Sequence, residues 1–275
     1  MNAYYVLQNR KISDDECVSH YQSTAHAQGV WNEFEQHMAV ATGLLACELE
    51  RFFPRDDLMI ARLSLDILGV IHQGQTIVRT HFIRTGRTIE LIESTLSTID
   101  KNGNERISVI MRAWRLATSD SRAISGLESP PPQATVAQLP DWDGMSLWRG
   151  GYINSLRAKI AHHRAGKSMV WLNTDIDMVA GQETSDFVHL MGMVDTSNGT
   201  AMRATDGAWI FPSIDLQIHL YRTPQGRWLG LDTTQEIGQT GVGLTSSVLY
   251  DELGAFGQAK QILTVRHVGK KSSKS

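Results

Sequence analysis

The 275-residue sequence has little of what marks several large classes of protein. It holds only two cysteines, Cys17 and Cys47, so we expect no disulfide framework and a reducing, cytoplasmic location. No apolar run approaches the roughly 20 residues that a membrane helix needs, and no signal peptide is expected, because no basic stretch precedes an apolar one at the start. The formal net charge is −3 with scattered lysines and arginines, which predicts no nucleic-acid partner.

Two patterns that mark active sites are missing as well. No Gly-Xaa-Ser-Xaa-Gly stretch occurs, which argues against a serine hydrolase with a nucleophile elbow. His162 and His163 are adjacent, which is not the spacing of metal ligands on one helix face, and we expect them to be solvated. The glycines of 238–243 lack the strand-to-helix context of a dinucleotide-binding loop.

Prolines are few, and four of the seven lie close together, at 130–132 and at Pro140. Proline supplies no hydrogen-bond donor to a sheet and favours extended backbone, so this stretch is predicted to link two halves without joining a sheet. The predicted organisation is an N-terminal repeat at 1–118, a linker at 119–150, a C-terminal repeat at 151–268 and a disordered basic tail at 269–275.

What the sequence does contain is a repeat of itself. Ser64-Leu65-Asp66 is matched 149 residues later by Ser213-Ile214-Asp215, and the acid-led turn at Asp100 is matched 151 residues later at Asp251. A period this long indicates two copies of one small fold rather than a solenoid, whose repeats span roughly 20 to 50 residues. One copy can then keep a site while the other keeps only the scaffold.

Each half contains one helix candidate. Apolar residues recur at three- and four-residue steps from Trp31 to Phe52, which predicts a helix of about 20 residues. The apolar stretch 185–196 predicts a second, buried helix with Thr184 or Ser185 as its N-cap and Asn198-Gly199 as its stop. Strands are predicted at 3–8, 17–27, 168–172, 208–222, 227–235, 241–250 and 258–267, and within 60–116 around turns at Gln73-Gly74 and Asn102-Gly103.

These elements predict an α+β fold, a double hotdog of two tandem repeats, each an antiparallel sheet wrapped around one long central helix. The second half also resembles the acyl-CoA thioesterase II family and the wider thioesterase-like superfamily, which are double hotdogs. The residues that carry the resemblance are Phe211-Pro212-Ser213-Ile214-Asp215-Leu216, His219-Leu220-Tyr221-Arg222, Pro224, Gly226, Trp228-Leu229, Gly241-Val242-Gly243-Leu244, Leu249-Tyr250-Asp251-Glu252, Gly254, Gly257 and Gln261, and more loosely Ser64-Leu65-Asp66, Gly74 and Arg84-Thr85-Gly86-Arg87.

The resemblance implies a thioester hydrolase of fatty acid metabolism whose substrate is an acyl-CoA or an acyl-carrier thioester. In that family, water is held between an Asp, a hydroxyl and a Gln, which match Asp195, Ser213 and Gln261 here. Such hydrolysis needs no metal ion and no organic cofactor. Hotdog proteins commonly pair their sheets, so a homo-oligomer is expected, and no membrane partner is expected.

This sequence departs from the family pattern at two places. Ser213 stands where threonine is commoner, so the hydroxyl is kept but the methyl group that stiffens the rotamer is lost. In the first helix, Ala41-Thr42-Gly43 stands where family members often have paired glycines. The backbone donors for the thioester oxygen are therefore not identified by the sequence.

The residues themselves leave two interpretations of the site open. A carboxylate at Asp195 opposes the negative end of the helix dipole, which suits a water-binding role, yet an Asp beside Asn198-Gly199 commonly bonds backbone amides at the helix exit. The residues alone favour the second interpretation, and the resemblance favours the first. Gln261 lies among apolar residues and needs polar partners, and its first-half counterpart falls near Ile110, so the first half is predicted to be scaffold. Direct attack by Asp195 to form an anhydride is a further possibility.

Two other functions are compatible with the fold. An enoyl-CoA hydratase or dehydratase would need an Asp–His pair as acid and base, and no histidine of that kind follows Asp195. A non-catalytic acyl-CoA-binding hotdog protein would keep the fold and lose turnover. Of the tryptophans, Trp142, Trp148, Trp171, Trp209 and Trp228 are interpreted as packing residues, although one of them can line an acyl tunnel.

Overall fold

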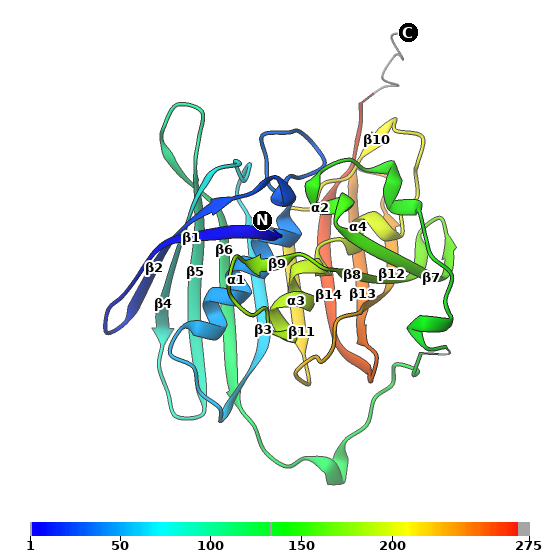
Figure 1. Ribbon diagram of the computed structural model, residues 1–275. Coiled ribbons are helices and arrows are strands. Elements are labelled where there is room, and N and C mark those ends of the chain that lie inside the picture. The colour runs from blue at the N-terminus through cyan, green and yellow to red at the C-terminus, as the bar shows by residue number, and fades with distance from the viewer. Residues whose placement is uncertain (1, 133, 269–275) are drawn as a thin grey trace.

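The computed structural model describes residues 2–132 and 134–268, and the predicted basic tail, 269–275, lies outside this range. The fold is mostly sheet with few helices (Figure 1). The first half contains β1 (Ala3–Ile12), β2 (Glu16–Ser23), α1 (Met38–Arg51), β3 (Leu58–Ile67), β4 (Gln75–Arg84), β5 (Ile89–Ile99) and β6 (Glu105–Ala117). The second contains α2 (Gly151–Asn154), β7 (Leu156–Arg164), β8 (Lys167–Thr174), β9 (Asp177–Val179), α3 (Asp186–Val194), α4 (Ser197–Thr200), β10 (Trp209–Ile210), β11 (Asp215–Leu220), β12 (Leu229–Ile237), β13 (Val242–Asp251), β14 (Gly254–Thr264) and β15 (Arg266–His267).

One sheet of thirteen strands runs through both halves, in the order β7-β8-β12-β13-β14-β11-β3-β6-β5-β4-β2-β1-β9. Neighbouring strands are antiparallel except β1 and β9, which are parallel. The halves join where β3 pairs with β11, with Asp66 directly opposite Asp215. In Figure 1 the blue-to-green strands of the first half therefore continue into the yellow-to-red strands of the second. A separate small sheet is formed by β10 and β15.

The first helix begins later than its apolar pattern predicts, at Met38 instead of Trp31. His37 is its N-cap, and the Nδ1 atom of His37 accepts a hydrogen bond from the Ala39 amide at 3.1 Å. Upstream, the Gln36 amide donates to the Ile71 carbonyl at 2.7 Å, a tertiary bond that an extended helix would have to break. Trp31 and the neighbouring Phe34 are therefore in a loop, 47% and 70% exposed, and do not belong to a buried helical stripe.

The second helix agrees more closely with its prediction. Ser185 caps α3 by accepting a hydrogen bond from the Val188 amide at 3.2 Å, and residues 187–194 are buried. The helix ends at Val194, and Asn198-Gly199 lies within the short helix α4 instead of forming the stop.

The helices α1 and α3 lie side by side (Figure 1), and Gly43 of α1 lies against Gly192 of α3. A Cβ atom on Gly43 would lie 2.9 Å from the Cα atom of Gly192, which is closer than such contacts occur. Gly192 follows Gly43 by 149 residues, the offset of the sequence repeat. The close crossing thus depends on the absence of a side chain at matching positions of the two halves.

Three strand predictions need correction. The stretch 208–222 is not one strand, because residues 211–214 separate β10 from β11. Strand β7 and the turn between β4 and β5 were not anticipated. The described part of the linker contains no strand, but its end does join the sheet edge: the Trp142 amide donates to the Ala158 carbonyl of β7 at 2.9 Å. An edge strand has unpaired backbone groups, which this segment satisfies.

Candidate functional site

The three residues predicted to form the site come from three different elements. Asp195 is the C-cap residue of α3, Ser213 lies in the segment before β11, and Gln261 lies in β14. The structure brings them together: Nε2 of Gln261 donates to Oδ1 of Asp195 at 2.7 Å and lies 3.5 Å from Oγ of Ser213.

The amide of Gln261 is held in a single orientation by a fourth residue. Oγ of Ser197 donates to Oε1 of Gln261 at 2.7 Å, so the nitrogen of the amide faces Asp195. Gln261 is completely buried, and its amide groups are satisfied by these side chains. Ser197, the first residue of α4, is a supporting residue that the sequence reasoning did not identify.

The position of Ser213 follows from the backbone on either side of it. The Ile214 amide donates to the Ile262 carbonyl at 3.2 Å, and the Thr264 amide donates to the Pro212 carbonyl at 3.0 Å. These bonds hold the segment alongside β14. The hydroxyl of Ser213 consequently lies beside Gln261 although it is outside β11.

Asp195 is in an environment that disfavours its charge. Burial raises the pKa of Asp195 to about 7, while the hydrogen bonds from Gln261 and Ser213 act in the opposite direction. A carboxyl group that titrates near neutral pH is suited to accept a proton from water.

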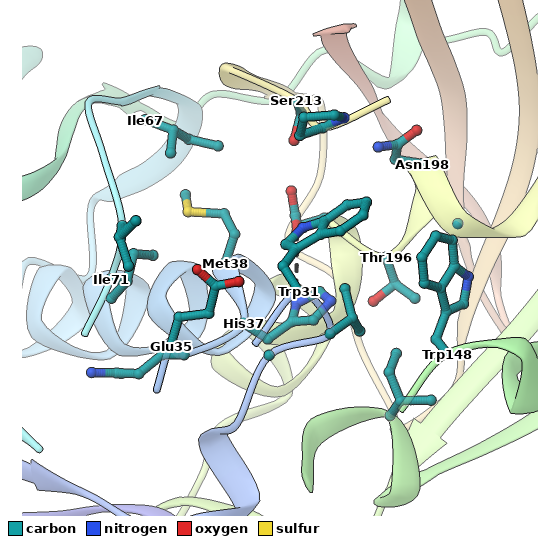
Figure 2. Close-up of a pocket in the computed structure, with 18 of the residues that line it drawn as sticks. Trp31, Glu35, His37, Met38, Ile67, Ile71, Trp148, Thr196, Asn198 and Ser213 are labelled. Carbon is teal, nitrogen blue, oxygen red and sulfur yellow. Dashed lines mark ion pairs between the residues drawn. The ribbon is translucent and has the colours of Figure 1, made fainter. Parts of the chain in front are cut away.

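Asp195 and Ser213 line a cavity of about 440 Å³ to which both halves contribute residues (Figure 2), whereas Gln261 is not a lining residue. Trp31 and Trp148, whose rings meet edge to face at 5.5 Å, are both part of the wall. Of the five tryptophans interpreted as packing residues, Trp148 thus lines the cavity, whereas Trp171 is in the core. The other lining residues include Val30, Glu35, His37, Met38, Ile67, Val70, Ile71, Met145, Ile153, Thr196, Asn198, Phe211, Pro212 and Arg266.

His37 is the lining residue that the sequence reasoning missed most clearly. Its Nδ1 atom lies 3.7 Å from Oδ2 of Asp195 (Figure 2), and its ring lies 4.2 Å from that of Tyr152, centroid to centroid. Burial lowers the pKa of His37 to about 3, and Nδ1 already accepts the Ala39 amide, so the imidazole is neutral and the contact is no ion pair. The sequence placed His37 inside a helix, which concealed its role as a cap at the cavity.

The first half has no matching set of polar residues. Ala46 stands 149 residues before Asp195, and Ile110 stands 151 residues before Gln261. Both positions lie in the first half's equivalent elements, α1 and β6. Only the second half therefore supplies the Asp–Gln pair. Within the described residues, no group of three His, Cys, Asp or Glu side chains could hold a metal ion, and no helix is long and apolar enough to cross a membrane.

Solved structures with the same fold include a protein of unknown function with a hotdog fold from Alicyclobacillus acidocaldarius, with a TM-score of 0.69 and 10% sequence identity over 94% of this chain and 96% of that one. Acyl-CoA thioesterase II TesB2 from Mycobacterium marinum has a TM-score of 0.67 and 14% identity over 95% and 96% of the two chains. The dehydratase domain of the polyketide PpsC from Mycobacterium tuberculosis has a TM-score of 0.56 and 11% identity over 96% and 98%.

No curated protein matches the chain by sequence. Two family models do match it: the acyl-CoA thioesterase N-terminal domain over residues 27–116, and the acyl-CoA thioesterase C-terminal domain over residues 128–265, which is half of the chain. The chain therefore belongs to the acyl-CoA thioesterase family, and it has a hotdog-type fold.

Proposed function

We propose that the protein is an acyl thioester hydrolase in which Asp195 activates a water molecule that Ser213 and Gln261 position. The observation that carries this proposal is the hydrogen-bonded cluster of these three side chains, two of which, Asp195 and Ser213, line a largely apolar cavity. The apolar lining suits an acyl chain, and the family membership supports coenzyme A as the thiol carrier.

The proposed architecture is a double hotdog with repeats at 1–118 and 151–268 and a linker at 119–150. Two observations support it. Asp66 pairs directly with Asp215, and Gly43 meets Gly192, so matching positions of the two halves face each other. Such pairing is what a two-fold axis between two equivalent units requires. The cytoplasmic location, the role in fatty acid metabolism and the homo-oligomer stay predictions.

The proposed reaction starts with the ionised form of Asp195. Its carboxylate takes a proton from the water while the water oxygen attacks the thioester carbonyl carbon. Gln261 and Ser213 orient the water by hydrogen bonds. The tetrahedral intermediate then collapses, the carbon–sulfur bond breaks, and the proton held by Asp195 passes to the leaving thiolate, which regenerates the carboxylate.

The oxyanion of that intermediate needs a hydrogen-bond donor. Met38, the first residue of α1, lines the cavity, and its amide has no hydrogen-bond acceptor among the described residues. The N-terminus of a helix carries a partial positive charge that stabilises an anion. We assign the Met38 amide to the oxyanion.

The test is release of free thiol from short, medium, long and aromatic acyl-CoAs. Asp195→Ala is expected to lower kcat by roughly 10²- to 10⁴-fold, and Gln261→Ala by roughly 10²-fold. Gln258→Ala is the matched control, because Gln258 lies exposed on the same strand, β14. Turnover that survives in Asp195→Ala with intact folding would disprove the assignment. No release by the wild type, with acyl-CoA still raising Tm, would favour a non-catalytic acyl-CoA-binding protein.

A second function is favoured by one specific observation. The sequence argument against a dehydratase was that no histidine follows Asp195, yet His37 reaches Asp195 from the other half at 3.7 Å. An Asp–His pair can add or remove water across the double bond of an enoyl thioester, and a dehydratase domain is among the proteins of similar fold. The thioesterase is preferred because Gln261 and Ser213 add neutral polar groups beside Asp195 that can position a water molecule, and because both family models describe thioesterase domains.

The variant His37→Asn separates the two functions. Asparagine keeps an acceptor for the Ala39 amide, so the cap of α1 is retained, but the imidazole is removed. If the protein is a thioesterase, His37→Asn should release thiol at a rate within a few-fold of the wild type. If it is a hydratase, His37→Asn should no longer hydrate enoyl-CoA, so the enoyl absorbance should stay constant. Loss of hydration in this variant, together with no thiol release by the wild type, would establish the dehydratase function.

A further inference from the structure

Glu35 is a second buried carboxyl group at the cavity that the proposed reaction does not use. Its residue is 9% exposed, and its Oε1 atom is buried without a hydrogen-bond partner. It takes part in none of the ion pairs found among residues 2–132 and 134–268. Figure 2 shows the carboxyl group directed toward the space between Met38 and Trp31.

A buried carboxyl oxygen without a partner costs free energy, so a structural reason for it should be visible. The backbone of Glu35 already holds the loop, because its carbonyl accepts the Gly29 amide at 2.7 Å and the residue bridges to His72. These backbone contacts fix the loop, and the carboxyl group adds an interaction with Asn32 of the same loop. Burial raises the pKa of Glu35, and interaction with Asn32 only partly opposes this effect.

The walls around Glu35 offer it no compensating cation. Met38, Ile71 and Val30 are apolar, and Arg266 is the only Lys or Arg among the lining residues. Arg266 is exposed, and it extends the wall from β15, on the side of Ser213 and Pro212. Asn32 is the group of the protein that interacts with the carboxyl group, so a further donor for it can come from a molecule that enters the cavity.

We propose, given the thioesterase function above, that the acyl chain of the substrate carries a hydrogen-bond donor, a hydroxyl or an ammonium group, which Glu35 accepts. A plain alkyl chain would desolvate the carboxyl group further and leave its Oε1 atom without a donor, so the cavity discriminates against it. The apolar residues contact the carbon chain, and Glu35 selects for its substituent. Glu35 is accordingly a specificity residue and takes no part in cleavage of the thioester.

The experiment measures binding, so that it does not depend on turnover. Non-hydrolysable thioether analogues of acyl-CoA are compared by calorimetry: plain chains, chains with a hydroxyl at the β carbon or the chain end, and chains with a terminal amine. A hydrogen bond to a charged group is expected to give the substituted chain a roughly ten- to hundredfold lower Kd in the wild type. The better of the hydroxyl and amine series identifies the source of the donor.

Glu35→Leu should remove this preference by weakening the substituted analogue and tightening the plain one. Glu35→Gln, which keeps an acceptor oxygen without the charge, should retain part of a hydroxyl preference and lose an ammonium preference. Glu33→Leu is the control, since Glu33 is an exposed neighbour. If Glu35→Leu does not fold, the proposal is still tested by Glu35→Gln and by the ratio of the Kd values of plain and substituted analogues for the wild type.

Two results would overturn the proposal: a wild type that binds plain and substituted chains equally, or Glu35 variants that leave the ratio unchanged. Parallel thiol-release measurements keep the two proposals apart. Selective binding without hydrolysis would refute the thioesterase and keep the role of Glu35. Hydrolysis without selective binding would support the thioesterase and refute the role of Glu35.

Discussion

Asp195 combines a favourable position for catalysis with an unfavourable one for stability. The burial that raises its pKa to about 7 also makes its ionised form costly in the folded protein. Gln261 donates to one oxygen of the carboxylate but adds no positive charge. Two measurable consequences follow from this environment.

The first is the pH dependence of turnover. Only ionised Asp195 can accept a proton from water, so kcat should fall as the pH decreases through about 7. A kcat profile from pH 5 to 9 measures this, and Gln258→Ala should show the same profile. A flat profile down to pH 5 would contradict a base with a raised pKa.

The second is the stability of Asp195→Asn. Because the folded-state pKa lies above the unfolded value near 3.9, the native state binds the proton more tightly, and stability is lost as the pH rises from about 4 to about 7. The asparagine variant escapes this loss, so above pH 7 it should be more stable by up to about 4 kcal/mol while remaining inactive. Urea unfolding at pH 8 and at pH 4 measures the effect. A gain of equal size at both pH values would show that the carboxyl charge is not its cause.

At the scale of elements, the contact between α1 and α3 rests on Gly43 and Gly192. A methyl group on Gly43 would overlap the flexible side-chain end of Met178 and lie 2.9 Å from the Cα atom of Gly192. One on Gly192 would lie 3.0 Å from the same Met178 end and 3.6 Å from the Cα atom of Gly43. The two sites thus share their neighbours and differ in how closely the new methyl group approaches them.

We therefore expect Gly43→Ala to lower the free energy of unfolding by about 1 to 3 kcal/mol, and Gly192→Ala to lower it less. Both substitutions gain the same helix propensity of alanine, so the difference between them reports the closer approach of the Gly43 methyl group to Gly192 and Met178. Urea unfolding of both variants measures that difference. Equal stabilities would mean that the helices separate easily at this point.

The helices also show where sequence reasoning works and where it fails. The Ser185 cap was predictable because a hydroxyl before an apolar run is a local signal. The start of α1 was not predictable, because Trp31 and Phe34 continue the apolar spacing of the helix. Only tertiary hydrogen bonds, such as that from the Gln36 amide to the Ile71 carbonyl, keep this segment out of the helix.

At the scale of the whole molecule, the two halves are joined by contacts that do not depend on the linker. Strand β3 pairs with β11, β1 pairs with β9, and α1 packs on α3. By contrast, residues 121–128 of the linker are exposed throughout. Residues 121–128 therefore connect the two halves covalently but bury little surface against them.

Cleavage at a protease site introduced within 121–128 should leave both fragments associated and the thiol release unchanged. Gel filtration of the nicked protein without denaturant measures this, and the uncut protein with the same insertion is the control. Separation of the fragments would contradict the extensive pairing between the halves. A loss of activity without separation would indicate that the linker positions Trp148 and the cavity wall.

The sequence by itself determined the family, the repeat and the presence of both central helices, because these depend on local patterns and on motifs that stay contiguous in the chain. It also led to Asp195, Ser213 and Gln261, whose catalytic role is a proposal. The tertiary structure decided which groups surround them. His37 and Glu35 lie about 160 residues from Asp195 in sequence, and no local pattern links them to it. They reach the same cavity only because α1 packs on α3 and the strands of both halves form one sheet. Distances between elements packed in this way depend on the tertiary structure and not on spacing in the chain.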